Sequence, residues 1–213
     1  MTSITAAMLS CVLLVLEITA DEGASAASAE ILQRLHMQWA HSPPGIVQTR
    51  DSSNFKSDQH NTVNWKSAKC AEILLVGRKA WGARESKKVD YLKTNGGVTI
   101  VFYHHTEKDE CNSTDACAQI IRRWQDYHQK TQKWSDIAYN FLIGSDGRVY
   151  EGRGFDVVGA HTLFYNNKSV SFGFVGNFTF HVPNSAMLTA AENLIQCGIH
   201  WAKISPNYKL YGQ

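Results

Sequence analysis

Four histidines stand where an imidazole could act on a ligand. His104 and His105 end an apolar, β-branched run, His128 lies near the end of a predicted helix, and His161 follows Gly159-Ala160 in a predicted loop. Neighbouring residues of a strand point to opposite faces, so only one of His104 and His105 can enter a given cleft. A single histidine of this kind is more often a polar surface residue or a helix-end cation than a ligand. Four of them around one cleft, at the end of a central strand, together indicate a site.

A zinc hydrolase is one chemistry that these residues suggest. Such an enzyme needs three protein ligands and an open position for water. His104 is one candidate ligand, and Tyr139 is a candidate general acid or donor to an oxyanion. Spacing defines no further ligand, so an enzyme would have to complete the zinc site with His105, His128 or His161.

Binding of a saccharide or a peptide is the other chemistry. Trp134, Tyr139, Phe155 and Tyr165 lie near predicted turns, where flat rings can pack on sugar rings or peptide stems. Core packing explains each of them equally well. Arg153 stands between two glycines, so its guanidinium could reach a carboxylate with two parallel hydrogen bonds, or form a structural ion pair instead.

The elements that must position these residues begin at about Cys70. Strands are predicted over Val98 to His104, Ala138 to Ile143, Arg148 to Glu151, Ser169 to Phe178 and near Tyr208 to Tyr211. Gly144-Ser145-Asp146-Gly147 predicts a hairpin turn. Amphipathic helices are predicted after Thr114-Asp115 and after Pro183-Asn184. Interleaved strands and helices indicate an α/β fold, a single domain with a central mixed β-sheet packed by helices.

Composition excludes several classes of protein. The 213 residues are 19% charged and carry a formal net charge of +2, so no large basic field points to nucleic acid. No run of 18 apolar residues is present, which argues against a transmembrane helix.

The N-terminal third differs in amino-acid composition from the rest of the chain. Residues 1–20 are mostly apolar and end in Ile18-Thr19-Ala20, which predicts a secretory signal peptide rather than an apolar strand or helix of the fold. Residues 21–69 are polar and Ala/Ser-rich and predict a flexible, low-complexity linker. The folded domain is expected over 70–213.

Cysteines and sequons agree with an extracellular protein. Once Cys11 leaves with the signal peptide, four cysteines remain, an even number that indicates two disulfides with three possible connectivities. Cys111 and Cys117 are close enough to close one loop, which would leave Cys70 for Cys197. A zinc–thiolate cluster is the weaker alternative because no C-x-x-C pair occurs. Glycosylation sequons begin at Asn112, Asn167 and Asn177.

Several ordered motifs give the region from about Cys70 to Gly212 a resemblance to the peptidoglycan recognition proteins of animal innate immunity. They are Trp81-Gly82-Ala83-Arg84, Tyr103-His104-His105-Thr106, the run from Trp134 to Gly144, Asp146-Gly147, the run from Tyr150 to Phe155, and Gly159-Ala160-His161-Thr162 with Asn166. The resemblance implies the fold of zinc-dependent N-acetylmuramoyl-L-alanine amidases and a long groove for glycan-peptide ligands. It also implies the disulfides Cys111–Cys117 and Cys70–Cys197.

The resemblance places ligand contacts at nine positions. They are Thr106, His128, Lys133, Trp134, Tyr139, Arg153, His161, Thr162 and Asn166. Family members that prefer meso-diaminopimelate stems have Gly-Trp at the positions of Lys133-Trp134 and an arginine like Arg153. Diaminopimelate has one carboxylate more than lysine, and a guanidinium is its natural partner. We therefore expect a weak preference for diaminopimelate-type peptidoglycan. Lys133 differs from those family members, which have glycine at its position.

The zinc ligands of the enzymatic members are incomplete here. His104 matches the first ligand. Gln213 follows Tyr211-Gly212 at the position where those members have a second histidine. Their third ligand, which is a downstream cysteine, and their terminal helix have no counterpart in the sequence. We therefore expect a secreted receptor that binds peptidoglycan and passes the signal to a protein partner. We expect neither a cofactor nor catalysis, so that Tyr139 would be a vestigial catalytic residue. The alternatives are a zinc-dependent amidase and a truncated product without function.

Overall fold

The computed structural model describes residues 69–212. The expected signal peptide, all but the last residue of the expected linker, and Gln213 lie outside the described residues. Within them, no helix is both long and apolar enough to cross a membrane.

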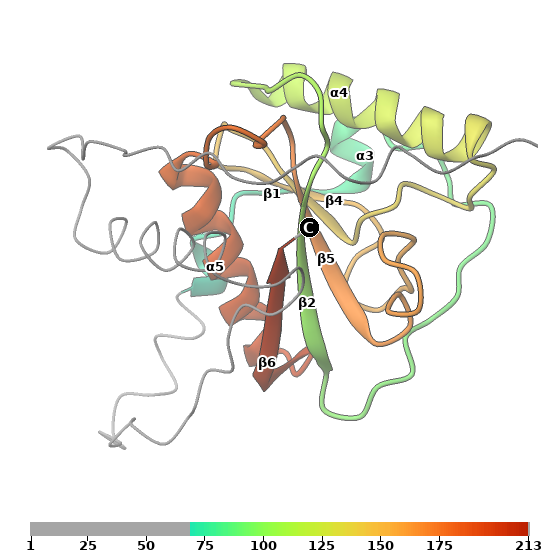
Figure 1. Ribbon diagram of the computed structural model, residues 1–213, viewed down its shortest axis with the longest axis vertical. Helices are drawn as coiled ribbons and strands as arrows, with labels where there is room; N and C mark the ends of the chain where they lie inside the picture. Colours follow the sequence, from blue (N-terminus) through green and yellow to red (C-terminus); the bar gives the residue numbers. More distant parts are fainter. Residues whose placement is uncertain (1–68, 213) are drawn as a thin grey trace, which may run out of the picture.

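A six-stranded mixed sheet forms the centre of the fold, as predicted (Figure 1). The strands are β1 (Leu75–Val76), β2 (Val98–His105), β3 (Phe141–Ile143), β4 (Val149–Glu151), β5 (Ser169–Phe174) and β6 (Ile204–Gly212). Their order is β1-β4-β3-β5-β2-β6, and every neighbouring pair is parallel except the hairpin β3–β4. The predicted turn closes that hairpin, with Gly147 N donating to Gly144 O at 2.9 Å. Parallel pairing through β2 and β5 explains why both strands are buried almost throughout.

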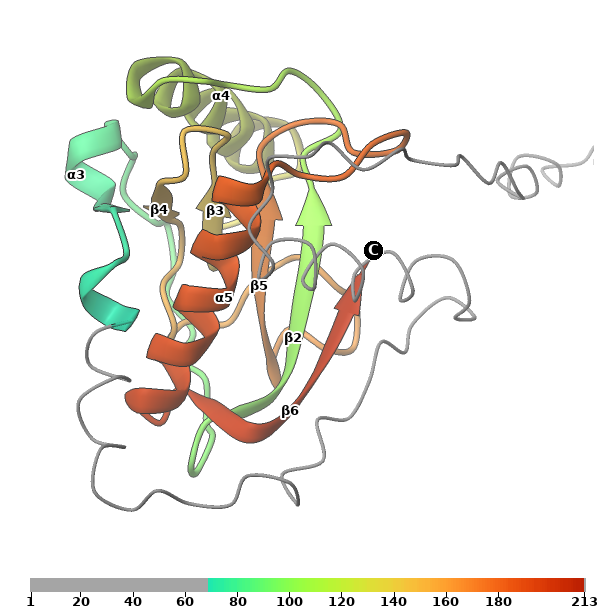
Figure 2. The same ribbon diagram turned by 90° about the vertical axis from the view of Figure 1, so that its left-hand side faces the viewer.

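Helices cover both faces of the sheet. They are α3 (Arg78–Trp81), α4 (Thr114–Asp126), the π-helical turn η2 (Tyr127–Thr131) and α5 (Ser185–His200). Figure 2 shows α5 lying across one face, where its apolar side packs on residues of β2, β3, β5 and β6. Apolar residues of α3 and α4 form a second core on the opposite face. The sheet therefore has two hydrophobic cores, as an α/β layered fold requires.

The ends of several elements differ from the predicted ones. Ser113 caps α4, rather than Thr114-Asp115, because Ser113 has extended backbone and its Oγ accepts from Ala116 N. Helix α5 begins directly after Asn184, as predicted, and Asn184 caps it, with Oδ1 accepting from Met187 N at 2.9 Å. The predicted strand from Ala138 starts only at Phe141, and β5 ends at Phe174. The short elements β1 and α3 were not predicted, since four residues or fewer carry no periodicity.

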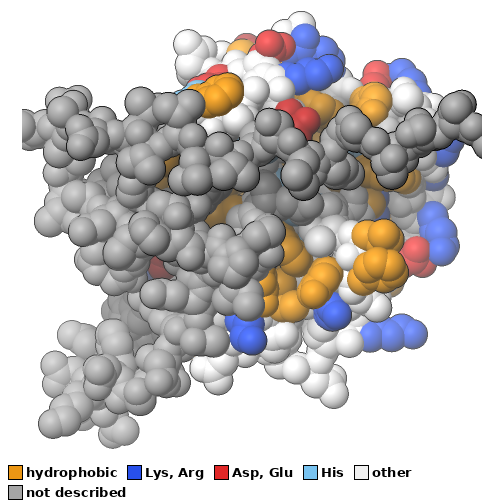
Figure 3. Space-filling view, viewed as in Figure 1, with side chains coloured by type: hydrophobic (Ala, Val, Ile, Leu, Met, Phe, Trp, Pro, Cys, Tyr) orange, Lys and Arg blue, Asp and Glu red, His pale blue; other side chains and the backbone are white. Residues whose placement is uncertain are grey.

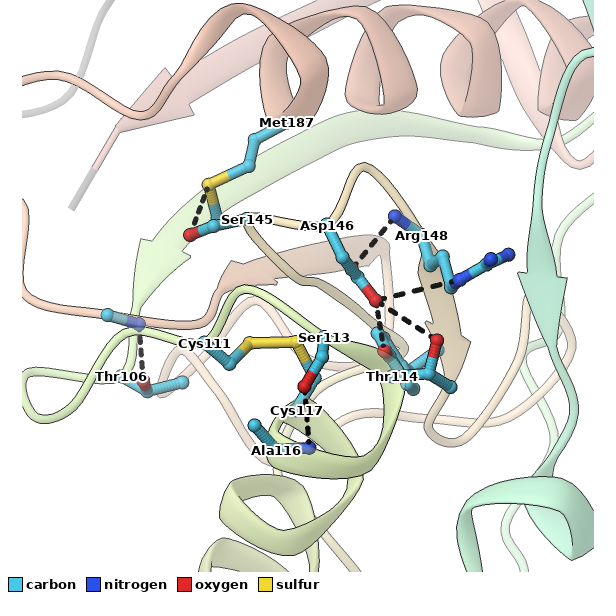
Figure 4. Close-up of a disulfide and its surroundings, with 12 residues drawn as sticks. Thr106, Cys111, Ser113, Thr114, Ala116, Cys117, Ser145, Asp146, Arg148 and Met187 are labelled. Carbon is cyan, nitrogen blue, oxygen red and sulfur yellow. Dashed lines mark hydrogen bonds and ion pairs between the residues drawn. A yellow bond between two sulfur atoms is a disulfide. The ribbon is translucent and has the colours of Figure 1, made fainter.

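Both expected disulfides are present. Cys111–Cys117 closes a loop of sequence separation 6, and Cys70–Cys197 spans 127 residues. Figure 4 shows the Cys111–Cys117 bridge beside the β3–β4 turn. A Cβ on Gly144 would lie 2.6 Å from Cys117 Sγ, so this turn needs glycine to pass the bridge. The bridge and the turn thus pack as one unit at the start of α4.

Candidate ligand-binding site

Seven rings form a continuous row on the face of β2 opposite α5. Neighbouring ring centroids are 5.0 to 6.1 Å apart. In order, the row runs Trp134, His128, Tyr139, His104, His161, Phe102, Tyr165. We call it the ring row. It brings together four of the nine residues that the sequence singled out as ligand contacts, and it also contains the candidate metal ligand His104.

Four parts of the fold supply the ring row, and one of them, the π-helical turn η2, carries His128. Phe102 and His104 alternate with core residues on β2, so both point away from α5. Trp134 and Tyr139 come from the segment before β3, and His161 and Tyr165 from the loop before β5. His105 points to the α5 side, where Nδ1 accepts from Phe178 N at 3.0 Å. The prediction that only one of the paired histidines enters the site is therefore confirmed.

Two glycines make room for the rings. A Cβ on Gly173 of β5 would lie 3.0 Å from Tyr139 Cγ, and one on Gly159 would lie 2.8 Å from His161 Nε2. Glycine inside a strand often marks such a close approach. That signal was present in the sequence, but it does not say which side chain comes close.

His128 is held in one tautomer between two indoles. Its ring stacks on Trp134 at 5.0 Å and on Trp124 at 5.7 Å, and its Nδ1 accepts from Ala138 N at 3.2 Å. Nε2 therefore carries the proton of the neutral ring and is the donor for a ligand. Burial lowers the pKa of His128 to about 4, and the charge of Arg153 adds to this effect.

A threonine hydroxyl joins the other two histidines of the row. Thr162 Oγ1 lies 3.3 Å from His104 Nε2 and 3.0 Å from His161 Nδ1. Burial lowers the pKa of His104 to about 4 and that of His161 to about 3. His161 Nε2 is buried with no hydrogen-bond partner among the described residues. Leaving a buried nitrogen without a hydrogen-bond partner costs free energy.

Tyr139 completes an uncharged centre. Burial raises the pKa of its phenol to about 12, and the nearby charge of Glu107 acts in the same direction. At pH 7 the phenol and the three imidazoles are therefore all neutral. The middle of the ring row offers polar edges and apolar faces without a net charge.

Arg153 is anchored by the backbone. Its Nε donates to Ile137 O, Nη1 to Val158 O and Nη2 to Asp136 O, at 2.7, 2.9 and 3.3 Å. A guanidinium has five N–H groups, so two are left, one on each terminal nitrogen. The side chain is thus pre-oriented and still has donors for a carboxylate.

Lys133 lies beside Trp134 in an unusual conformation. Its φ is +62°, in the left-handed region that favours glycine, and its side chain is exposed. Trp134 N donates to His128 O at 2.9 Å, which ties this turn to η2. Lys133 and Arg153 therefore both belong to the Trp134 end of the ring row, because Arg153 is anchored on the segment that follows Trp134.

Two of the expected contact residues support the backbone instead of lining the row. Thr106 is 1% exposed, and its Oγ1 accepts from Gly176 N at 2.9 Å. Asn166 Oδ1 accepts from His161 N and Thr162 N at 2.8 and 2.9 Å, which fixes the loop that presents them. Of the four candidate aromatic residues, Phe155 packs in the core against Phe141 at 4.6 Å.

Buried polar residues that sequence reasoning missed hold the site together. Gln125 exchanges hydrogen bonds with the backbone of Arg84 and donates to Asp136 Oδ1 at 2.6 Å. Asn140 donates to the carbonyls of Gly154 and Val157 and accepts from Ser171 N. Asn140 lies within the run from Trp134 to Gly144, whereas no motif contains Gln125. Neither role could be predicted, because the hydrogen-bond partners are distant in the chain. Figure 3 shows Lys and Arg side chains near the edge of one face of the molecule, with hydrophobic side chains between them.

The residues described do not form a zinc site. A tetrahedral site needs four donors, at least three of them from the protein. Within residues 69–212 no three His, Cys, Asp or Glu side chains converge, and His104 Nε2 faces the Thr162 hydroxyl. Zinc here would need donors that residues 69–212 do not bring together.

The sheet order, its two helical layers and the contact of His104 with Tyr139 define an α/β layered protein with a ring-lined site on one face of its sheet. The family model described as N-acetylmuramoyl-L-alanine amidase matches residues 94–213. Among curated proteins, peptidoglycan-recognition protein LB of Drosophila melanogaster is 43% identical over 143 residues. This match covers 67% of the chain and 61% of that relative. The chain belongs to the peptidoglycan-recognition protein family.

Further relatives and solved structures agree. Peptidoglycan-recognition protein SA of Drosophila melanogaster is 40% identical over 73% of this chain and 72% of its own length. A variant of Drosophila PGRP-LB in complex with tracheal cytotoxin is 42% identical, with a TM-score of 0.63 over 65% of this chain and 81% of that chain. The ectodomain complex of PGRP-LCa and PGRP-LCx with tracheal cytotoxin gives 39% identity and a TM-score of 0.64, over 66% and 84%. Those structures bind a muropeptide, and the last also pairs two recognition proteins.

Proposed function

We propose that this chain is a secreted innate-immunity protein that binds bacterial peptidoglycan at the ring row, with a preference for diaminopimelate-type stems. The observation that carries the proposal is the continuous row of seven rings with neutral polar edges. Sugar and peptide ligands present alternating apolar faces and hydrogen-bonding groups, which suits such a surface. The complexes of relatives with tracheal cytotoxin support the same ligand class.

The ligand has a direction on this surface. Lys133 and Arg153 supply cationic donors at the Trp134 end, so the carboxylates of the stem peptide belong there. At the other end, Phe102, Tyr165 and the edge of His161 suit the glycan. Thr162 and Asn166 take part through the loop that presents His161, and Thr106 through the backbone beneath it.

We propose binding without catalysis. His104 is one imidazole in contact with a hydroxyl, and the sequence has Gln213 where the enzymatic members have their second histidine. An amide is a poor zinc ligand beside an imidazole. The alternative is a zinc-dependent enzyme with the N-acetylmuramoyl-L-alanine amidase activity that the family description names.

Secretion is part of the proposal. It rests on the apolar segment 6–20 and on two disulfides, which persist in oxidising compartments. Exposed sequons at Asn112, Asn167 and Asn177 are compatible with glycosylation on that route. A protein partner would carry the signal onward, by analogy with the paired recognition proteins.

The test is a pull-down of the purified mature chain on insoluble peptidoglycan of the diaminopimelate and lysine types. We expect retention on both, stronger on the first, with no free stem peptide released and no zinc found in the protein by metal analysis. Released stem peptide together with bound zinc would establish the amidase instead. Recovery of all the protein in the unbound fraction on both materials would contradict the proposed binding function.

A further inference from the structure

Two large apolar side chains project from the loop beside the far end of the ring row. Leu163 is 73% exposed and Phe164 is 81% exposed. They stand directly before Tyr165, the last ring of the row. Single exposed apolar residues are common on protein surfaces, but adjacent ones next to a binding site indicate an interaction surface.

The backbone at Phe164 is strained. Its φ is +69°, in the left-handed region that is sterically unfavourable for a bulky residue and free of that cost for glycine. The exposed ring makes no core contact that offsets this cost. Strain of this kind is a pointer to function, because the fold alone would be better served by glycine.

The loop presents these side chains rigidly. Asn166 Oδ1 holds the amides of His161 and Thr162, and Tyr165 N donates to Thr162 O at 3.1 Å. Ser169 Oγ donates to Tyr165 O at 2.7 Å. Leu163 and Phe164 are thus pre-organised, which lowers the entropy lost on binding.

The chemistry of this end suits an uncharged ring. Lys168 Nζ lies 4.4 Å from the Tyr165 centroid and Phe102 contacts Tyr165 edge-on, so neighbouring side chains already contact Tyr165. Leu163 and Phe164 are the large apolar side chains of this loop that are most exposed to solvent. No acidic residue occurs from His161 to Asn166. A pyranose presents a face of C–H groups, and burying that face against an aromatic ring removes apolar surface from water.

We propose that Leu163 and Phe164 form a second saccharide subsite that continues the ring row. It takes the sugar next to the stem-bearing sugar in a glycan strand, and so makes the protein prefer strands over single muropeptides. This inference rests on the proposed function, and in particular on the glycan lying at the Tyr165 end.

The test compares two probes on the wild-type chain and on Phe164→Gly, which accepts the left-handed backbone. The probes are a single N-acetylmuramoyl peptide and a four-sugar glycan fragment with the same stem. We expect the wild type to bind the longer probe about tenfold more tightly, the size of effect that burial of one aromatic ring gives. Phe164→Gly should lose that tenfold difference and keep the affinity for the shorter probe.

Phe180→Ala is the matched control. Phe180 is 85% exposed but lies between β5 and α5, next to Phe178 in the α5-side core, so its removal should leave both affinities unchanged. An equal loss on both probes, or no loss on the longer one, overturns the subsite while leaving peptidoglycan binding intact. The subsite is also overturned if the wild type self-associates and Phe164→Gly abolishes this self-association without changing the affinity for glycan. Failure of the wild type to bind either probe overturns the proposed function and the subsite with it.

Discussion

The side chains of the candidate site owe their properties to their immediate surroundings. Arg153 shows this most clearly, because three backbone carbonyls hold it and leave two N–H groups for a ligand. His128 is neutral because two indoles bury it, and His161 keeps one nitrogen without a partner in the described part of the chain. Each feature leads to a measurable consequence.

Arg153→Ala should weaken binding to diaminopimelate-type peptidoglycan about tenfold more than binding to the lysine type. The reason is the additional carboxylate, since a hydrogen bond to a charged group contributes about 1.5 to 3 kcal/mol. Binding isotherms on both materials measure the ratio. Because alanine also leaves three carbonyls without a donor, Arg153→Lys, which keeps the charge, serves as the second variant. An equal loss on both materials in both variants would contradict the assignment.

The stability of the protein should fall between pH 6.5 and pH 4. Burial lowers the pKa of His128 from 6.5 to about 4 in the folded chain, so in this window the unfolded chain binds the additional proton. Protonation then favours unfolding, by up to about 1.4 kcal/mol per pH unit for each such group. Denaturant unfolding at pH 7.5 and pH 5 measures the difference. His128→Gln should show a smaller pH dependence than the wild type, and an unchanged dependence would rule out His128 as a source.

At the scale of elements, the site depends on how irregular segments meet the sheet. Helix α4 ends in the π-helical turn η2, and this turn presents His128 to the row. Turns of this type occur often at functional sites. The loop before β5 carries His161, and its close packing leaves no room for a side chain at Gly159.

Gly159→Ala should displace the His161 ring, since the new Cβ would lie 2.8 Å from Nε2. We expect a destabilisation of about 1 to 3 kcal/mol and a clear loss of muropeptide affinity. Thermal unfolding and binding isotherms together give both values. Gly77→Ala is the matched control, because its Cβ would meet only Glu151 Oε2, at 3.8 Å. Equal behaviour of the two variants would show that the clearance at Gly159 is unimportant.

At the scale of the whole molecule, one covalent bond joins the start of the described chain to its last helix. Cys70–Cys197 spans 127 residues and Cys111–Cys117 only 6. Both cores and the ring row lie within the part of the chain that the first bridge closes, apart from β6.

Replacing Cys70 and Cys197 together by alanine should lower the free energy of unfolding by about 5 kcal/mol, against about 2 kcal/mol for the Cys111 and Cys117 pair. The expected difference comes from the entropy that a longer closed loop removes from the unfolded chain. Guanidinium unfolding of the two double variants measures it. A larger effect from the shorter loop would show that packing around Cys117 outweighs chain entropy.

Local patterns in the sequence determined much of this protein. The apolar run from Val98 to His104, the hairpin turn, the start of α5 after Asn184 and the opposite directions of His104 and His105 all follow from neighbours within a few residues. The family motifs further named five of the seven rings of the row, all except Phe102 and Tyr165. Tertiary structure decided which of them meet, because the contacts join segments far apart in the chain. It placed Phe155 in the core and Tyr165 in the row, bridged His104 and His161 through Thr162, and anchored Arg153 on three carbonyls. Burial and pKa arise from that long-range packing, which no local spacing encodes.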